Sequence, residues 1–113
     1  MTRPEHNPDA PYPTLDRLRI VAAALADRVL PTPVTQWQTG VITNALSADT
    51  QVWLKLELFQ KTGTFKVRGA LNNLDHLTDQ QREQGVVTVS AGNHAIALAY
   101  TAQLAGISAQ VVM

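Results

Sequence analysis

The sequence predicts an α/β fold in which a partial parallel sheet is flanked by helices, and three observations lead to it. From residue 51 onward the pattern runs strand, helix, strand, helix, strand, and helices between strands act as crossovers in parallel sheets. Residues 86–89 form a continuous apolar run, which is typical of a strand buried on both faces. The last strand begins near residue 109 and the sequence stops inside it, so we expect a truncated α/β unit.

A proline-rich arm and one helix precede this unit. Residues 1–13 hold four of the six prolines, and we expect them to form a flexible arm. Thr14 or Asp16 can cap a helix that runs to about Arg28. Its apolar residues recur at helical spacing and predict one stripe, made by Leu15, Leu18, Ala22, Leu25 and Val29.

Two prolines separate this helix from the α/β unit. Pro31 and Pro33 end the helix, because the residue before a proline is pushed out of the helical region. Residues 32–37 then read as extended, and residues 40–49 as a loop.

The elements of the α/β unit follow from local patterns. Residues 51–57 alternate apolar and polar side chains, which predicts a strand. The elements after it are a helix over 65–77, a short helix over 78–83, a strand over 86–89, a helix over 94–104 and a strand from 109. Gly85 and Gly106 follow the last two helices as C-terminal glycines, and Thr78 can cap the short one.

Composition excludes several classes of partner. The 113 residues include nine Lys and Arg and nine Asp and Glu, so a neutral chain has no long-range attraction for nucleic acid or anionic membranes. No apolar run is long enough to cross a bilayer. Because there is no cysteine, a disulfide or a thiolate metal site is impossible. We expect no metal site, no nucleic-acid or membrane partner, and a cytoplasmic protein.

Lys66 is the candidate catalytic residue. It stands where an extended segment gives way to a helix. The field of a helix N-terminus is positive and disfavours an ammonium, so it favours the neutral amine. Only the neutral amine attacks an aldehyde to form a Schiff base, which makes Lys66 a candidate covalent anchor for a cofactor. The alternative is an ordinary solvated lysine.

A second loop, residues 90–93, follows the strand over 86–89. In an open parallel sheet, ligands bind beyond the carboxyl ends of the strands. The small residues of this loop allow backbone N–H groups to approach a carboxylate or phosphate closely. Asn93 adds a side-chain donor, although it could serve only as a helix cap, and Ser90 could be only a turn hydroxyl. Together the two loops indicate an amino-acid site with an aldehyde cofactor.

Both loops resemble motifs of one family. Residues 62–70, Thr-Gly-Thr-Phe-Lys-Val-Arg-Gly-Ala, resemble the Schiff-base lysine motif of fold-type II pyridoxal-phosphate enzymes, in the form found in threonine/serine dehydratases (ammonia-lyases). Residues 90–95 resemble the asparagine loop of the same family, and the spacing and residues 31–33 also match. The resemblance covers residues 14–113 and implies a tryptophan synthase β-like fold.

The resemblance implies roles for individual residues. Lys66 would carry pyridoxal 5'-phosphate and, once displaced by substrate, would move the Cα proton. Phe65 would lie beside the pyridine ring, and Asn93 would hydrogen-bond the ring hydroxyl. The substrate carboxylate would be held, largely through backbone N–H groups, by Ser90, Ala91, Asn93 and His94. We expect Arg68 to make a structural contact between elements instead of binding substrate.

The resemblance also implies an activity and a domain plan. The substrate would be L-threonine or L-serine, and loss of its β-hydroxyl would give a 2-oxo acid and ammonia. Residues 14–49 would belong to the larger domain, so the apolar stripe of the first helix would be exposed here, and residues 50–113 would form an incomplete small α/β cofactor-binding domain. We expect a homo-oligomer for the full-length protein.

Several alternatives remain open. The chain could be a non-catalytic remnant, a serine racemase or a β-replacement enzyme of the same family. Position 91 is Ala where the family's serine racemases carry a second serine, which favours elimination, and position 64 is Thr where the dehydratases usually have Ser. A plain dinucleotide-binding βαβ unit is disfavoured, because no Gly-x-Gly-x-x-Gly turn follows a strand.

Overall fold

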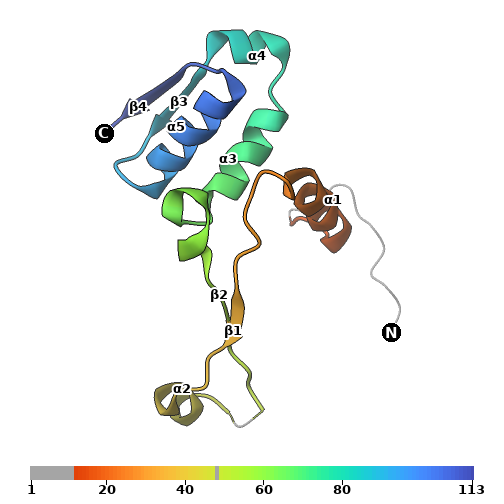
Figure 1. Cartoon of the computed structure of the whole chain (residues 1–113), viewed down its shortest axis with the longest axis vertical. Coiled ribbons are helices and arrows are strands. Elements are labelled where there is room, and N and C mark those ends of the chain that lie inside the picture. The colour runs from red at the N-terminus through yellow and green to blue at the C-terminus, as the bar shows by residue number, and fades with distance from the viewer. Residues whose placement is uncertain (1–11, 48) are drawn as a thin grey trace.

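The computed structural model describes residues 12–47 and 49–113, which form an α/β body with a projecting hairpin (Figure 1). The elements are α1 (Leu15–Leu25), β1 (Val34–Gln36), α2 (Gly40–Ala45), β2 (Trp53–Lys55), η1 (Glu57–Phe59), η2 (Lys61–Gly63), α3 (Lys66–Asp75), α4 (Asp79–Gln84), β3 (Val86–Val89), α5 (Asn93–Ala105) and β4 (Ala109–Val112). The hairpin makes the molecule elongated, with extents of 53 × 36 × 26 Å. Nearly all of the predicted arm, residues 1–13, lies outside the described residues.

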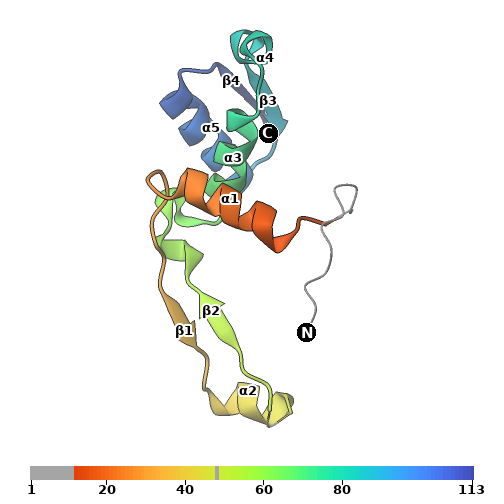
Figure 2. The ribbon, with the colours of Figure 1, turned by 90° about the vertical axis from the view of Figure 1, so that its right-hand side faces the viewer.

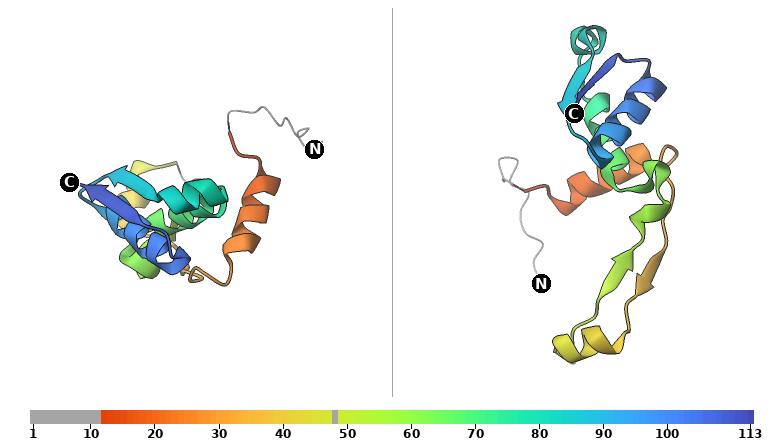
Figure 3. Two further views of the ribbon diagram at one scale, coloured as in Figure 1. Left: turned by 90° about the horizontal axis from the view of Figure 1, so that it is seen from above. Right: turned by 90° about the vertical axis from the view of Figure 1, so that its left-hand side faces the viewer.

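The parallel sheet of the body is made by β3 and β4. Their register pairs Val86 with Ala109 and Val89 with Val112, and α5 is the crossover between them. Viewed from above, α5 lies along one face of this sheet (Figure 3). The prediction of a partial parallel sheet flanked by helices is therefore confirmed for this part of the chain.

The strand β2 does not join the parallel sheet, and the prediction that it would was wrong. It pairs antiparallel with β1, which places Val34 opposite Lys55 and Gln36 opposite Trp53. The alternating pattern of β2 is typical of an antiparallel strand with one face toward solvent. The continuous apolar run of β3 predicted a strand buried on both faces, and this was wrong for one face, because Val87 and Val89 are 69% and 78% exposed. The predicted loop over 40–49 was also wrong in part, because its first residues form α2.

The core lies between α3 and α5, which run in the same direction. Near the start of α3, Val67 and Ala70 pack with Ala97 of α5, and near its end Leu74 packs with Leu98 and Ala102, which lie in the middle and the later part of α5. The alanines let the two helices approach closely. Buried Thr101 keeps its hydroxyl satisfied by donating to the backbone oxygen of Ala97 at 2.8 Å.

The helix α1 joins this core through its C-terminal half, where Val21 and Leu25 pack against the cluster around Val67. Leu25 is 4% exposed and belongs to the cluster around Val67, while Leu15 and Leu18 are 60% and 52% exposed. Figure 2 shows α1 lying across the molecule between the body and the hairpin. Thr14 caps the helix by accepting from the N–H of Arg17, as predicted. The stripe is thus exposed at its start, as expected, and buried at its end.

The local signals at helix ends are confirmed. Thr78 and Gln81 form a reciprocal capping box at the start of α4. Gly85 ends that helix with φ 84°, and Gly106 ends α5 in the left-handed region with φ 67°. None of the helices in residues 12–47 and 49–113 is long and apolar enough to cross a membrane.

Candidate cofactor site

The two predicted site loops lie at the same end of the α3–α5 pair. Because α3 and α5 run in the same direction, the N-terminus of α3, with Lys66, lies beside the N-terminus of α5, with Asn93. The turn η2, just before Lys66, also contacts α5 (Figure 1). The loop 90–93 follows the carboxyl end of β3, the expected edge for a ligand.

Lys66 is the first residue of α3 and its side chain is exposed. Its backbone N–H donates to the hydroxyl of Thr64 at 3.3 Å, so the threonine found where the dehydratases usually have serine keeps a function in the turn. The amine Nζ lies 5.2 Å from the centre of the Phe65 ring. Within the described residues it has no carboxylate partner, whereas Nζ of Lys55 lies 3.8 Å from Glu57. Lys66 therefore presents an accessible amine.

The asparagine loop presents several donors that the protein itself does not use. The residue before α5, Gly92, is its cap, and no side chain caps this helix, so the alternative reading of Asn93 as the cap was wrong. Among the described residues, the exposed Asn93 amide has no hydrogen-bond partner. The backbone N–H groups of Ala91, Asn93 and His94 likewise donate to no acceptor in this part of the chain. His94 is half-buried.

Ser90 is engaged differently from its neighbours. Its N–H donates to the backbone oxygen of Val112 at 3.0 Å, as part of the sheet. Its hydroxyl accepts from the N–H of Gly92 at 3.2 Å, which is the turn-hydroxyl reading of this residue. Ser90 can therefore donate to a ligand only with its hydroxyl hydrogen.

An ion pair between Glu57 and Arg68 supports the lysine loop. Arg68 donates from Nε to Oε2 and from Nη2 to Oε1 of Glu57, each at 2.8 Å, so the predicted inter-element contact of Arg68 is confirmed. These bonds lower the pKa of Glu57 to about 2, with further help from the Thr32 hydroxyl and against partial burial. The pKa of Arg68 is raised by the same bonds. Sequence analysis missed Glu57, because it read as one polar position of a strand.

The turn between these partners contains an unusual residue. Thr62 has φ 65°, which is rare for a residue other than glycine. Its Oγ1 is buried and has no hydrogen-bond partner in the described structure. The neighbouring Gly63 has φ 70°. No sequence pattern indicated that Thr62, instead of the adjacent glycine alone, adopts this conformation.

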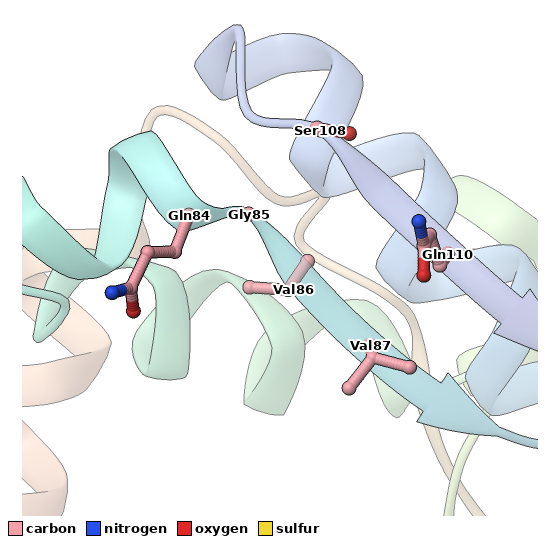
Figure 4. A pocket seen from close by; sticks show the side chains of 6 residues that line it. All are labelled: Gln84, Gly85, Val86, Val87, Ser108 and Gln110. Carbon is pink, nitrogen blue, oxygen red and sulfur yellow. The ribbon is translucent and has the colours of Figure 1, made fainter.

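A surface hollow elsewhere on the body is not part of this site. It has a volume of about 220 Å³ and lies at the starts of β3 and β4, the end of the sheet away from loop 90–93 (Figure 4). Its lining comprises Gln84, Gly85, Val86, Val87, Ser108 and Gln110. In open parallel sheets ligands bind beyond the carboxyl ends of the strands, whereas this hollow lies at their amino ends, so we assign no ligand to it. No group of three metal-ligating side chains occurs within residues 12–47 and 49–113.

Comparison with known proteins decides the family. A family model described as pyridoxal-phosphate dependent enzyme matches residues 25–113, a span that contains both loops. The chain belongs to this family. Membership confirms the predicted cofactor, pyridoxal 5'-phosphate, and the fold-type II architecture.

The chain covers only part of the length of its relatives in the family. The chain is 58% identical to a catabolic L-threonine dehydratase of Staphylococcus aureus over 62 residues, which are 55% of this chain and 18% of that protein. It is 41% identical to the solved maize serine racemase, with a TM-score of 0.69, covering 86% of this chain and 29% of that one. It is 37% identical to the solved threonine deaminase of T.th., with a TM-score of 0.68, covering 89% and 34%. The chain thus spans between 18% and 34% of the length of these relatives.

The residues present fit the family's cofactor. Lys66 offers an exposed amine without a carboxylate partner in the described residues, and the exposed Phe65 offers a ring beside it. The unused donors at the start of α5 suit an anionic or phenolate-like oxygen. These groups lie at one end of the same helix pair.

Proposed function

We propose that this chain forms the lysine-bearing and asparagine-bearing part of a pyridoxal-phosphate-dependent ammonia-lyase. Its substrate would be L-threonine or L-serine, and the products a 2-oxo acid and ammonia. The observation that supports this most directly is that the accessible amine of Lys66 and the uncapped N-terminus of α5 lie at one end of the α3–α5 pair. The identity of 58% to an L-threonine dehydratase supports the substrate class.

Lys66 and Phe65 would act on the cofactor side of the site. Pyridoxal phosphate, when bound, supplies an electron sink for negative charge at the substrate Cα. The amine of Lys66 would hold the cofactor covalently and, once free, would take the Cα proton. Phe65 lies beside this amine and would limit the positions of the cofactor ring. Asn93 would donate to the ring hydroxyl.

The start of α5 would hold the substrate carboxylate. The N–H groups of Ala91, Asn93 and His94 have no other acceptor in the described structure and carry the positive end of the helix dipole. Ser90 would add its hydroxyl, since its N–H is used by the sheet. This arrangement recognises the carboxylate common to all amino acids, so it does not distinguish threonine from serine.

The residue at position 91 separates elimination from racemisation. The solved relatives include serine racemases, and the resemblance seen in the sequence implies a second serine in that group where this chain has Ala91. A methyl group cannot exchange a proton at the opposite face of the substrate Cα. We therefore favour the ammonia-lyase over the racemase. In a longer protein that carries this segment, release of 2-oxobutyrate from L-threonine would support this reading, and formation of D-serine from L-serine without ammonia would overturn it.

Cofactor attachment tests the central assignment on this chain itself. Incubation with pyridoxal phosphate, reduction with borohydride and peptide mapping should find the cofactor on Lys66 in preference to Lys55 and Lys61, the other two lysines. Lys66→Ala should remove the labelled peptide, and the matched variant Lys61→Ala should keep it. Equal labelling of all lysines, or unchanged labelling of Lys66→Ala, would contradict the proposal and favour the non-catalytic remnant.

The domain plan and assembly are part of the same proposal. Residues 14–49 would belong to the larger domain and residues 50–113 to the smaller, cofactor-binding one. The exposed Trp37 and Trp53 on the hairpin, 40% and 58% accessible, favour a further contact at this surface, because such large rings are usually covered. The homo-oligomer and the cytoplasmic location remain predictions, which gel filtration and fractionation of the full-length protein would test.

A further inference from the structure

The first turn of α3 is held in place by a network that reaches across three segments. Glu57 begins η1, Arg68 lies in the first turn of α3, and Thr32 comes from the extended segment after α1. Both oxygens of Glu57 are bound by Arg68, and Oε1 also accepts from the Thr32 hydroxyl. The paired forks of an arginine and a carboxylate fix relative orientation as well as distance.

A side-chain amide extends the network on the other side of the turn. Gln60 is 4% exposed, accepts from the N–H of Leu30 at 2.9 Å and donates to its oxygen at 2.8 Å, as a neighbouring strand would. Arg68 also donates to that oxygen, at 3.3 Å. The turn 57–63, through Gln60, and the start of α3, through Arg68, are therefore both bound to the backbone oxygen of Leu30.

The place of Arg68 decides what this network does for Lys66. Residues two apart in a helix point to different faces. Arg68 is half-buried and held down on one face of the first turn, so Lys66 is presented on another, where it is exposed. Residues of the network lie on both sides of Thr62 in the sequence, with Gln60 before it and Arg68 after it. Thr62 has a disfavoured backbone conformation, and such a conformation persists only when the surrounding contacts hold it in place.

We infer that Glu57, Arg68, Thr32 and Gln60 form a positioning clamp for Lys66, which sets the direction of its amine toward the start of α5. The inference rests on the proposed function, because it assigns a purpose to the clamp only if Lys66 carries the cofactor. None of the four clamp residues needs to touch cofactor or substrate. Each acts through the backbone that carries Lys66.

The test measures labelling selectivity within one chain. After treatment with pyridoxal phosphate and borohydride, the ratio of label on Lys66 to label on Lys61 should fall about tenfold in Glu57→Gln, which corresponds to about 1.4 kcal/mol. Arg68→Gln should give the same fall, and the double variant little more, because both remove one interaction. Thr32→Val keeps the ion pair and should lower the ratio by only about threefold.

The matched control is Asp75→Asn. It removes a comparable ion pair, between Asp75 at the other end of α3 and Arg28, and should leave the ratio unchanged. Hydrogen exchange should show faster exchange at residues 62–68 in Glu57→Gln and not in Asp75→Asn. If Asp75→Asn lowers the ratio as much, or if Glu57→Gln and Thr32→Val both leave it unchanged, the clamp is overturned. Equal labelling of the lysines in the unaltered chain would instead overturn the proposed function, and the clamp's purpose with it.

Discussion

A Cβ atom placed on Gly85 would lie 2.7 Å from the backbone oxygen of Ser108. This is the point where β3 begins beside β4, and the N–H of Val86 donates to the same oxygen at 2.8 Å. Gly85 also has φ 84° and ψ −176°, a region that is essentially restricted to glycine. The parallel sheet can therefore start at this position only because residue 85 lacks a side chain.

Replacing Gly85 with alanine should destabilise the chain by about 3 kcal/mol, because strain and the close contact with a backbone oxygen add. Gly69→Ala is the matched control, since Gly69 lies inside α3 and its Cβ would meet nothing within 4 Å. It should stabilise the chain by about 0.5–1 kcal/mol. Urea unfolding followed by circular dichroism gives both free energies. A loss in Gly69→Ala equal to that in Gly85→Ala would contradict the steric explanation.

Helix ends such as the one at Gly85 are the parts of the fold that could be predicted from the sequence alone. Gly85, Gly106 and the Thr78 cap are local signals, and each ends or begins a helix as predicted. The partner of β2 is a different kind of question, because alternation predicts a half-buried strand without saying which strand it pairs with. Its partner β1 is separated from it along the sequence by α2, a helix in a segment that was predicted to be a loop.

Stability should depend on pH through Glu57. Its pKa in the folded chain is about 2, below the ordinary value of 4.5, so its ionised form favours the folded state. The contribution, on the order of 3 kcal/mol, is complete above about pH 5 and is lost as the pH falls from 4.5 to 2. The difference in unfolding free energy between the unaltered chain and Glu57→Gln should shrink over this range. A difference that stays constant down to pH 2 would contradict the pairing with Arg68.

The helix α1 should be held by its C-terminal half, where Val21 and Leu25 contact the core. Leu25→Ala removes a side chain that is 4% exposed and packs with Val67, and should cost about 2–4 kcal/mol. Leu18→Ala changes a side chain that is 52% exposed and should cost less than about 1 kcal/mol. Thermal unfolding of the two variants compares these values directly. Similar costs would mean that the start of α1 is also packed in solution.

For the candidate site, sequence reasoning named the candidate groups, which stay predictions, and missed the residues that support them. Lys66 and Asn93 stand in motifs whose residues are contiguous, so a single sequence reveals them. Glu57 and Thr32 are 25 residues apart, and no local pattern links them to each other or to Arg68. The two loops come together through the packing of α3 on α5 instead of through a shared sheet, and that packing depends on contacts distant in sequence.

Thr62 should be a source of strain in the lysine turn. Its left-handed conformation costs a residue with a Cβ about 1–2 kcal/mol, and its buried hydroxyl lacks a partner in the described structure. Thr62→Gly removes both costs and adds the flexibility of glycine to the unfolded chain, so we expect a net gain of about 1 kcal/mol.

Thr64→Gly is the control two residues away. Thr64 is extended, with φ −153°, and its hydroxyl accepts from the N–H of Lys66, so this change should cost about 1–2 kcal/mol. The two variants thus change the same residue type in the same turn and should move the urea midpoint in opposite directions. If Thr62→Gly lowers the midpoint as Thr64→Gly does, the Thr62 hydroxyl has a stabilising partner in solution. In that case the turn before Lys66 is relaxed, and the clamp around it does not hold a strained residue.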